Sequence, residues 1–267
     1  MTNRQTSSSD EPLFHLKGVS CSAGGRRILP ALDLEIGAGR TIGLIGHNGS
    51  GKSTLIKLLA RQIAPSAGLI RFGGRALESW PSREFARNVA YMPQQMPTAV
   101  GTSVYELVKF GRYPWHGSLG SFGTIDRIKV EEALELTGTA AMAGRYVETL
   151  SGGEHQRAWL AALIAQDSRC LLLDEPISAL DIAHQVAMLD LVRDLTKTRG
   201  LTTIMVLHDV NMAARFSDEI IALHSGCLMA RGIPAQLMTP DELQRIYGVA
   251  MEVMIQPSTG KPIALAQ

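Results

Sequence analysis

The chain has 267 residues, of which 45% are hydrophobic, and a formal net charge of +1. This length suffices for one large α/β domain, or for a domain with an inserted subdomain. The nearly neutral charge gives no electrostatic argument for nucleic acid, and we expect no nucleic acid as a partner. No apolar run approaches the roughly 20 residues that a membrane-spanning helix needs. The 3 cysteines lack C-x-x-C spacing, which argues against a disulfide framework or a zinc site.

The N-terminal part of the chain predicts strands that lead to a glycine-rich loop. Residues 1–12 are polar and lack the apolar core of a signal peptide, so we expect a disordered lead-in. Two strands are expected at 14–19 and 32–36, on either side of a turn at Gly24-Gly25. The apolar run 42–45 indicates a buried strand, and an apolar helical run follows the loop after it.

Between this strand and helix lies GHNGSGKST, which fits the phosphate-loop pattern G-x-x-x-x-G-K-[ST]. Its glycines let successive N–H groups point at a polyphosphate, and the helix adds the positive end of its dipole. Lys52 places an ammonium on the outer phosphates, and Ser53 offers a hydroxyl to Mg²⁺. A turn that merely caps the helix is the alternative. The full pattern predicts that ATP is bound by Gly46, His47, Asn48, Gly49, Ser50, Gly51, Lys52, Ser53 and Thr54.

A helical region is predicted between two blocks of strands. Strands at 69–72 and 89–92 follow the phosphate loop, with a helical turn at 82–87 between them. From about 94 to 166 the pattern is helical, with candidate helices at 104–110, 125–136 and 153–165. We expect this region to be a helical subdomain inserted into an α/β core.

Strands and helices alternate again in the C-terminal part of the chain. The expected elements are, in order, strand 170–173, helix 182–198, strand 202–207, helix 210–216, strand 219–224, strand 226–232 and small helices near 235 and at 241–247. Such alternation indicates a mainly parallel sheet with right-handed crossovers. No element is predicted from Gln256 on. We therefore expect a single domain over 13–256 and a tail at 257–267.

Three predicted strands end in chemically reactive groups: the phosphate loop, Asp174-Glu175 and His208. Because ligands in an open parallel sheet bind beyond the carboxyl ends of the strands, we expect these groups at one edge. Asp174 suits Mg²⁺, which prefers oxygen ligands. Glu175 suits a base that accepts a proton from attacking water, and His208 could contact that water or the γ-phosphate. A helix cap or a solvated surface position is the alternative for each residue alone.

The stretch LSGGEHQR, residues 150–157, indicates a second phosphate-binding site. Ser151 with Glu154 three residues later fits a capping box, so a helix starts here. Two glycines in the first turn weaken a helix by about 1 kcal/mol each relative to alanine, and a cap alone does not need them. Close approach of the backbone to an anion explains Gly152 and Gly153.

This stretch resembles the signature of ATP-binding-cassette (ABC) ATPases, and the resemblance covers nearly the whole chain. The phosphate loop, Gln94, the signature, CLLLDEP, residues 178–181 and His208 occur in the family's order and spacing. The resemblance implies an α/β P-loop NTPase fold with a mainly parallel core sheet, an N-terminal antiparallel β part and a helical subdomain. It also implies a head-to-tail homodimer, in which each ATP lies between one phosphate loop and residues 151–153 of the second copy.

The same resemblance assigns roles to individual residues. It implies a magnesium site formed by Ser53, Gln94 and Asp174. It implies ATP hydrolysis catalysed by Glu175, His208 and Gln94. Gln94 would also sense the γ-phosphate and touch the membrane partner, with the adjacent Gln95 as the alternative.

Two positions depart from the family's pattern. Ala23 stands where an aromatic residue usually stacks on adenine, so that stacking is weak or supplied elsewhere. Ile177 stands where a threonine is common after Asp174-Glu175-Pro176. That change removes a hydroxyl beside the acid but leaves the acid itself, so we expect activity to persist.

The stretch VYELVKFGRYPWHG, residues 104–117, indicates a group within the family. Its Gly111–Gly117 part resembles a loop in ATPases of importers for iron–siderophore complexes, haem and cobalamin. With AQDSRCLLLDEP and ALDIAHQ, the strongest resemblance is to ATPases of ferric-hydroxamate siderophore importers. Local packing of Tyr113 and Trp115 in a turn is the alternative explanation for this loop.

The resemblance to importer ATPases implies partners and a location. Transmembrane permease subunits would dock near Gln94 and Gly111–Gly117, and a periplasmic or surface substrate-binding protein would act indirectly. The chain would then be peripheral, on the cytoplasmic face of the bacterial inner (plasma) membrane. Because a cassette does not contact the cargo, iron hydroxamate rests on family likeness, with haem and cobalamin as alternatives.

Two other function classes remain open. A soluble ABC ATPase that acts on nucleic acid or protein complexes would associate tightly with DNA at physiological salt. A phosphotransferase would use the same phosphate loop but would need an acceptor site, and it would not need residues 151–153.

Overall fold

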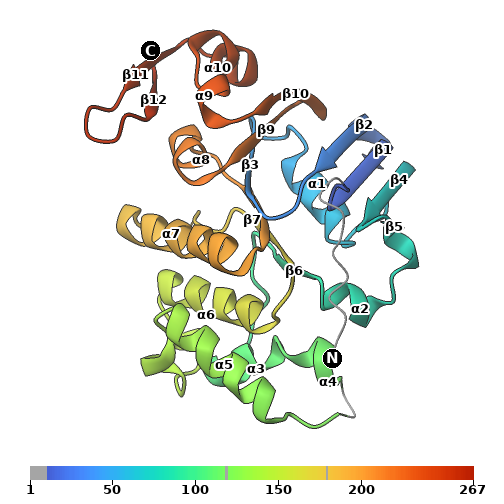
Figure 1. Ribbon diagram of the computed structural model, residues 1–267, viewed down its shortest axis with the longest axis vertical. Coiled ribbons are helices and arrows are strands. Elements are labelled where there is room, and N and C mark those ends of the chain that lie inside the picture. Colours follow the sequence, from blue (N-terminus) through green and yellow to red (C-terminus); the bar gives the residue numbers. More distant parts are fainter. Residues whose placement is uncertain (1–10, 118–119, 179) are drawn as a thin grey trace.

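The computed structural model describes residues 11–117, 120–178 and 180–267, with helices arranged around β-sheets (Figure 1). The largest sheet has six strands in the order β10-β9-β3-β8-β7-β6. These strands are β3 (Thr41–Ile45), β6 (Val89–Met92), β7 (Cys170–Asp174), β8 (Thr202–Val206), β9 (Glu219–His224) and β10 (Cys227–Gly232). All neighbours pair in parallel except β9 and β10, which confirms the mainly parallel sheet.

Two core clusters lie on opposite faces of this sheet. In β7, Leu171 and Leu173 belong to one cluster and Cys170 and Leu172 to the other, because successive side chains of a strand point to opposite faces. The first cluster includes residues of α6 (Gly152–Ala165), α7 (Ile182–Arg199) and α8 (Val210–Phe216), together with other helices, and the second includes residues of α1 (Lys52–Leu59). Burial on both faces explains why these strands are continuous apolar runs.

A smaller antiparallel sheet packs on the α1 side, in the order β2-β1-β4-β5. Its strands are β1 (Phe14–Ala23), β2 (Arg26–Ile36), β4 (Ala67–Phe72) and β5 (Arg75–Ala76). Both β1 and β2 are longer than predicted and extend to the turn itself. Gly24 and Gly25 have φ of 57° and 76°, and two residues with positive φ make a hairpin turn that continues the strand twist.

The helical region predicted from the sequence forms a group of helices, drawn in green and yellow in Figure 1, and its buried residues continue the first core cluster. Helices α3 (Val104–Phe110) and α5 (Thr124–Leu136) pack against each other and against α6. The three helices predicted here are confirmed to within one residue at each end. Two short helices, α2 (Ser82–Ala86) and α4 (Tyr113–His116), lie near this group of helices, and α4 was not predicted. Single 3₁₀ turns cover Leu77–Ser79, Ala140–Met142 and Val147–Thr149.

The C-terminal part contains α9 (Pro234–Leu237), α10 (Pro240–Tyr247), β11 (Met251–Ile255) and β12 (Pro262–Ala266). Strands β11 and β12 form an antiparallel hairpin, so the expectation of no element after Gln256 is wrong. The amide of Asn211 explains the difference, because it donates to the carbonyl of Ala264 at 3.0 Å and accepts from the N–H of Ala264 at 2.8 Å. Such a long-range contact leaves no local pattern in the sequence.

Parts of two expectations lie outside the described residues. These are residues 1–10 of the lead-in and Ala179 of the 178–181 stretch. Among the helices of the described chain, none combines the length and the apolarity needed to cross a membrane.

Candidate functional site

The phosphate loop leaves β3 and enters α1 along a path that requires glycine. Gly49 and Gly51 have φ of 78° and 96°, a region that residues with a Cβ rarely adopt. At Gly46, with φ of 139°, an added Cβ would lie 2.1 Å from the carbonyl oxygen of Leu223. The glycine spacing seen in the sequence therefore matches the demands of this backbone.

Lys52 folds back over the loop that precedes it. Its Nζ donates to the carbonyl oxygens of Gly46 and His47, at 2.8 and 2.9 Å, and the residue is 5% exposed. Burial lowers the pKa of this ammonium, while the nearby charges of Glu175 and Asp174 act in the opposite direction. The cation thus lies inside the curve of the loop, where it can contact an anion that the loop binds.

The three reactive strand ends meet at one edge of the sheet, as predicted. Strand β8 lies between β3 and β7, and Val206 is in register with both Leu44 and Asp174. His208 lies two residues after the end of β8, and its Nε2 lies 2.6 Å from a carboxylate oxygen of Glu175. Parallel pairing thus brings together groups that are far apart in the sequence.

Asp174 is buried at the end of β7 and has one unused oxygen. Its Oδ1 accepts a hydrogen bond from the hydroxyl of Ser53 at 2.9 Å. Its Oδ2 is buried and has no hydrogen-bond partner among the described residues. Burial raises the pKa of this carboxyl, and the bond from Ser53 partly opposes that effect. A buried, unpartnered carboxylate oxygen beside a hydroxyl is a donor set that fits a hard divalent cation.

Glu175 is held between two side chains from other elements. Its Oε2 accepts from the amide nitrogen of Gln94 at 2.8 Å, and His208 contacts its Oε1. Gln94, rather than its neighbour Gln95, makes this contact. Glu175 also has φ of 55°, a backbone conformation that is costly for a residue other than glycine. Such strain is common at functional sites, and the contacts with Gln94 and His208 hold the carboxylate of this residue.

A pocket of about 580 Å³ opens beside these residues. It is lined by the phosphate loop from His47 to Thr54 and by Ala23, Arg26, Arg27, Ile28, Glu175, His208 and Ser225. The sequence analysis did not single out Arg26, Arg27 or Ser225. Two arginines directly after the Gly24-Gly25 turn, beside the atypical Ala23, are the signal that could have indicated the first two.

The predicted capping box at the start of α6 is confirmed. The N–H of Ser151 donates to a carboxylate oxygen of Glu154 at 2.8 Å, and the N–H of Glu154 donates to the hydroxyl of Ser151 at 3.4 Å. However, residues 151–153 do not line the pocket beside the phosphate loop. One chain thus brings together the phosphate loop, Gln94, Asp174-Glu175 and His208, but not the signature residues.

A larger cleft, of about 1300 Å³, has different chemistry. Arg169 and Thr202, which line it, lie at the start of β7 and β8, away from the reactive strand ends. Some charges in this cleft are paired with each other, as in the 3.0 Å contact between Lys129 and Asp167. We therefore assign function to the smaller pocket, which holds the groups suited to phosphate chemistry.

Comparison with known proteins agrees with this assignment. The family model described as ABC transporter matches residues 29–178. The chain is 40% identical to the iron(3+)-hydroxamate import ATP-binding protein FhuC of Bacillus subtilis, over 91% of this chain and 90% of that protein. It is 39% identical to the hemin import ATP-binding protein HmuV of Gloeobacter violaceus, over 93% of this chain and 92% of that protein.

A solved structure shows the same fold. It is a dimeric ATP-binding cassette bound to ADP and Pi, with a TM-score of 0.73 and 24% identity, and the match covers 83% of this chain and 98% of that one. The range matched by the family model contains the phosphate loop, Gln94, residues 151–153 and Asp174-Glu175. The chain therefore belongs to the ABC transporter family and is an ATP-binding subunit that has the ATPase fold of this family.

Proposed function

We propose that this chain is the ATP-hydrolysing motor subunit of a membrane importer for ferric siderophores of the hydroxamate type. The observation that carries the motor role is the Glu175 carboxylate, held by Gln94 and His208 beside the phosphate-loop pocket. The name of the iron-hydroxamate relative supports a ferric hydroxamate as the imported cargo. The hemin relative supports haem as a second candidate.

The residues beside the pocket suit transfer of the γ-phosphoryl group of ATP to water. Loop N–H groups and the start of α1 would hold the phosphates, with Lys52 on the outer ones. Glu175 would accept the proton of the attacking water. Gln94 and His208 would each donate to one of its oxygens and so fix the direction in which the remaining lone pairs point. A positioned base of this type contributes about 10²–10⁴ in rate.

Magnesium would be held by Ser53, Asp174 and Gln94. The unpartnered Oδ2 of Asp174 and the adjacent hydroxyl of Ser53 support this proposal. Gln94 donates to Glu175 through its amide nitrogen, which leaves its amide oxygen to serve as a ligand. When bound, the cation would neutralise charge that develops on the phosphates.

A second copy of the chain would complete each ATP site. Ser151 and Gly152 are exposed at the start of α6, and residues 151–153 are outside the pocket of their own chain. A helix N-terminus with two glycines suits an anion brought by another molecule. The dimeric cassette of the same fold supports a homodimer. ATP can drive closure only if it binds the closed dimer more tightly than the open one.

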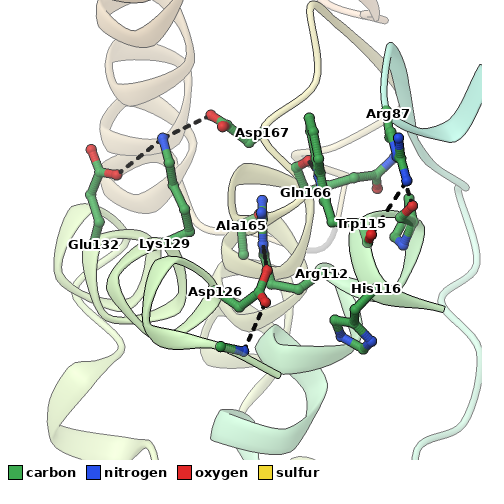
Figure 2. Close-up of polar contacts among 12 residues, drawn as sticks. Arg87, Arg112, Trp115, His116, Asp126, Lys129, Glu132, Ala165, Gln166 and Asp167 are labelled. Atoms are coloured by element: carbon green, nitrogen blue, oxygen red, sulfur yellow. Dashed lines mark hydrogen bonds and ion pairs between the residues drawn. The ribbon is translucent and has the colours of Figure 1, made fainter. Parts of the chain in front are cut away.

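The Gly111–Gly117 loop would receive the permease, and it is anchored to elements that lead to the nucleotide. Figure 2 shows Trp115 beside Gln166, whose carbonyl accepts from the indole N–H at 2.7 Å. Gln166 follows α6, whose other end carries the signature. Its amide donates to the carbonyl of Val89 in β6 at 3.1 Å, and β6 leads to Gln94. A displacement of the loop would thus reach Gln94 at one ATP site and, through α6, the signature residues that complete the other ATP site.

Exposed aromatic residues support docking on this surface. Local packing explains why Trp115 is present in this loop, but Phe110 and Tyr113 remain 65% and 49% exposed. A groove of about 480 Å³ lies nearby, with lining residues that include Phe85, Tyr91, Pro93, Pro97 and Trp159. Exposed apolar surface of this kind is typical of protein interaction sites. A cytoplasmic helix of the permease would fit it.

Docking on the permease would place the chain at the cytoplasmic face of a bacterial inner membrane, as a peripheral subunit. The import functions named for the relatives support this location. A substrate-binding protein would act on the other side of the membrane, without contacting this chain.

The ATPase role is tested with Glu175→Gln, which keeps the shape of the side chain but removes the base. ATP affinity should stay within about threefold of wild type, and turnover should fall by about 10²–10⁴. Glu252→Gln, which changes an exposed glutamate of β11, should keep wild-type turnover. Wild-type turnover in Glu175→Gln would show that Glu175 is not the base.

The cargo is tested with the transporter that copurifies with this chain. In proteoliposomes containing ATP, uptake of a ferric hydroxamate should exceed uptake of haem. Uptake of haem alone would establish the second candidate instead.

A further inference from the structure

Arg26 directly follows the two-residue hairpin turn beside the nucleotide pocket. It is the first residue of β2 and pairs directly with Ala23, the last residue of β1. Only Gly24 and Gly25 separate the two, both with positive φ, so the hairpin places Arg26 firmly beside Ala23. Both residues line the pocket.

The strand register shows which way Arg26 faces. Cys21 and Ala23 lie on one face of β1, because they are two residues apart. Their partners in β2 are Leu29 and Arg26, and directly paired residues share a face. The bulge between these pairs accounts for the odd spacing in β2. Leu29 reaches the end of the phosphate loop, since a Cβ added to Gly51 would lie 2.6 Å from its Cδ2. Arg26 is thus on the face of the hairpin that looks toward the phosphate loop.

The guanidinium of Arg26 is available to a ligand. Arg26 is exposed, and its side chain makes no hydrogen bond, ion pair or cation–π contact within the described residues. Some other surface arginines do make such contacts, as Arg75 does with Glu84 and Trp80, whereas the neighbouring Arg27 makes none within the described residues. Ala23 beside it contributes a single methyl group, which leaves room above the hairpin for a flat ring.

We infer that Arg26 binds the base of the nucleotide by stacking its planar guanidinium on the purine ring, in a site that discriminates weakly between adenine and guanine. This inference rests on nucleotide binding by the phosphate loop. Guanidinium planes stack on aromatic faces, and every purine offers such a face. Ala23, Gly24 and Gly25 have no side-chain polar group that could read the edge of the base. GTP should therefore bind and be hydrolysed within about threefold of ATP.

The test measures competition by ATP, GTP and inorganic triphosphate against a fluorescent ATP analogue, all with Mg²⁺. Arg26→Ala should weaken ATP and GTP binding alike by about two- to fivefold, as expected for an exposed cation–π contact. It should leave the affinity for triphosphate, which has no base, unchanged. Ala23→Tyr should strengthen ATP binding, because it adds an aromatic ring at the same place.

Arg71→Ala is the matched control, since Arg71 is an exposed arginine of β4 in the same small sheet, outside the pocket. It should leave all three affinities unchanged. Unchanged ATP affinity in Arg26→Ala would overturn the inference. An equal loss of affinity for triphosphate in this variant would also overturn it, because Arg26 would then bind the phosphates. A wild-type preference for ATP over GTP above about tenfold would overturn it as well. Failure of wild type to bind any of the three ligands would instead contradict phosphate-loop nucleotide binding itself.

Discussion

Removing the carboxylate of Asp126 should destabilise the helical part of the protein strongly. Asp126 accepts from the Arg112 guanidinium at 2.9 Å, and their side chains are 12% and 4% exposed (Figure 2). It also accepts from the N–H of Gly123, before the first turn of α5, at 3.0 Å. Arg112 donates in addition to the carbonyl of Ala165, the last residue of α6, at 2.7 Å. The pair thus joins α5, α6 and the loop proposed to meet the permease.

Asp126→Ala would leave the buried charge of Arg112 without its counter-ion. Loss of one partner from a buried ion pair costs about 3–5 kcal/mol in free energy of unfolding. Glu131→Ala is the control, because it breaks an exposed pair with Arg127, whose side chains are 62% and 61% exposed. Such exposed pairs contribute about 0.5 kcal/mol or less. The difference between the two variants therefore isolates the effect of burial.

The pH dependence of this effect follows from the pKa of Asp126. Burial acts to raise that pKa, but the N–H of Gly123 and the guanidinium of Arg112 outweigh it, so the pKa is lowered overall. A lowered carboxyl pKa gives stability that is present above the unfolded value and is lost as the pH falls through the folded value. The difference between wild type and Asp126→Ala should thus stay constant from neutral pH to about pH 4 and shrink below it.

Urea denaturation followed by circular dichroism measures the free energy of unfolding of wild type and both variants. We expect Asp126→Ala to lose at least about 2 kcal/mol more than Glu131→Ala. Equal losses in the two variants would refute the reasoning from burial.

Three further predictions concern the phosphate loop and the docking loop. Lys52→Ala should lose ATP binding, measured with a fluorescent analogue, because it removes the ammonium inside the loop; undiminished affinity would contradict this role. Gly46→Ala should lose both ATP binding and thermal stability, since its Cβ would lie 2.1 Å from the carbonyl oxygen of Leu223. Gly49→Ala should lower the free energy of unfolding by only about 1 kcal/mol, the cost of its positive φ, because the space around Gly49 is open. Equal losses of stability in Gly46→Ala and Gly49→Ala would argue against the steric cause. Gln166→Ala should keep the ATPase activity of the isolated chain but reduce its stimulation by the permease, and full stimulation would exclude this residue from coupling.

The reactive edge of the sheet could be predicted because each reactive group follows a buried apolar run. Asp174 follows such a run in β7, and His208 lies two residues after the end of β8. Parallel pairing of neighbouring strands then requires their carboxyl ends to lie together. The predicted proximity of these groups is therefore a consequence of topology, which the alternation of strands and helices already indicated.

The contacts of Glu175 could not be predicted in the same way. Gln94 is 81 residues away in the sequence, and the adjacent Gln95 remained the alternative. The positive φ of Glu175 also has no local signal, because it depends on how the surrounding elements hold this turn. Side-chain contacts between distant elements depend on packing, which a residue pattern does not specify.

The position of Arg26 escaped prediction for a related reason. The sequence indicated the Gly24-Gly25 turn and the atypical Ala23, but the predicted strands, 14–19 and 32–36, stopped several residues short of the turn on each side. Only the register of the full hairpin, with its bulge, shows that Arg26 shares a face with Leu29. The pairing of β12 with β11 escaped prediction as well, because Asn211 holds that hairpin from a distant helix.

The most direct test of the proposed mechanism is the mass in solution of the Glu175→Gln variant with MgATP and without it. Each ATP is proposed to join the phosphate loop of one copy to residues 151–153 of another, so a variant that cannot hydrolyse ATP should remain in the joined state. Light scattering after gel filtration should give a dimer with MgATP and a monomer without nucleotide. A monomer under both conditions, alone and with the permease, would contradict the proposed head-to-tail site.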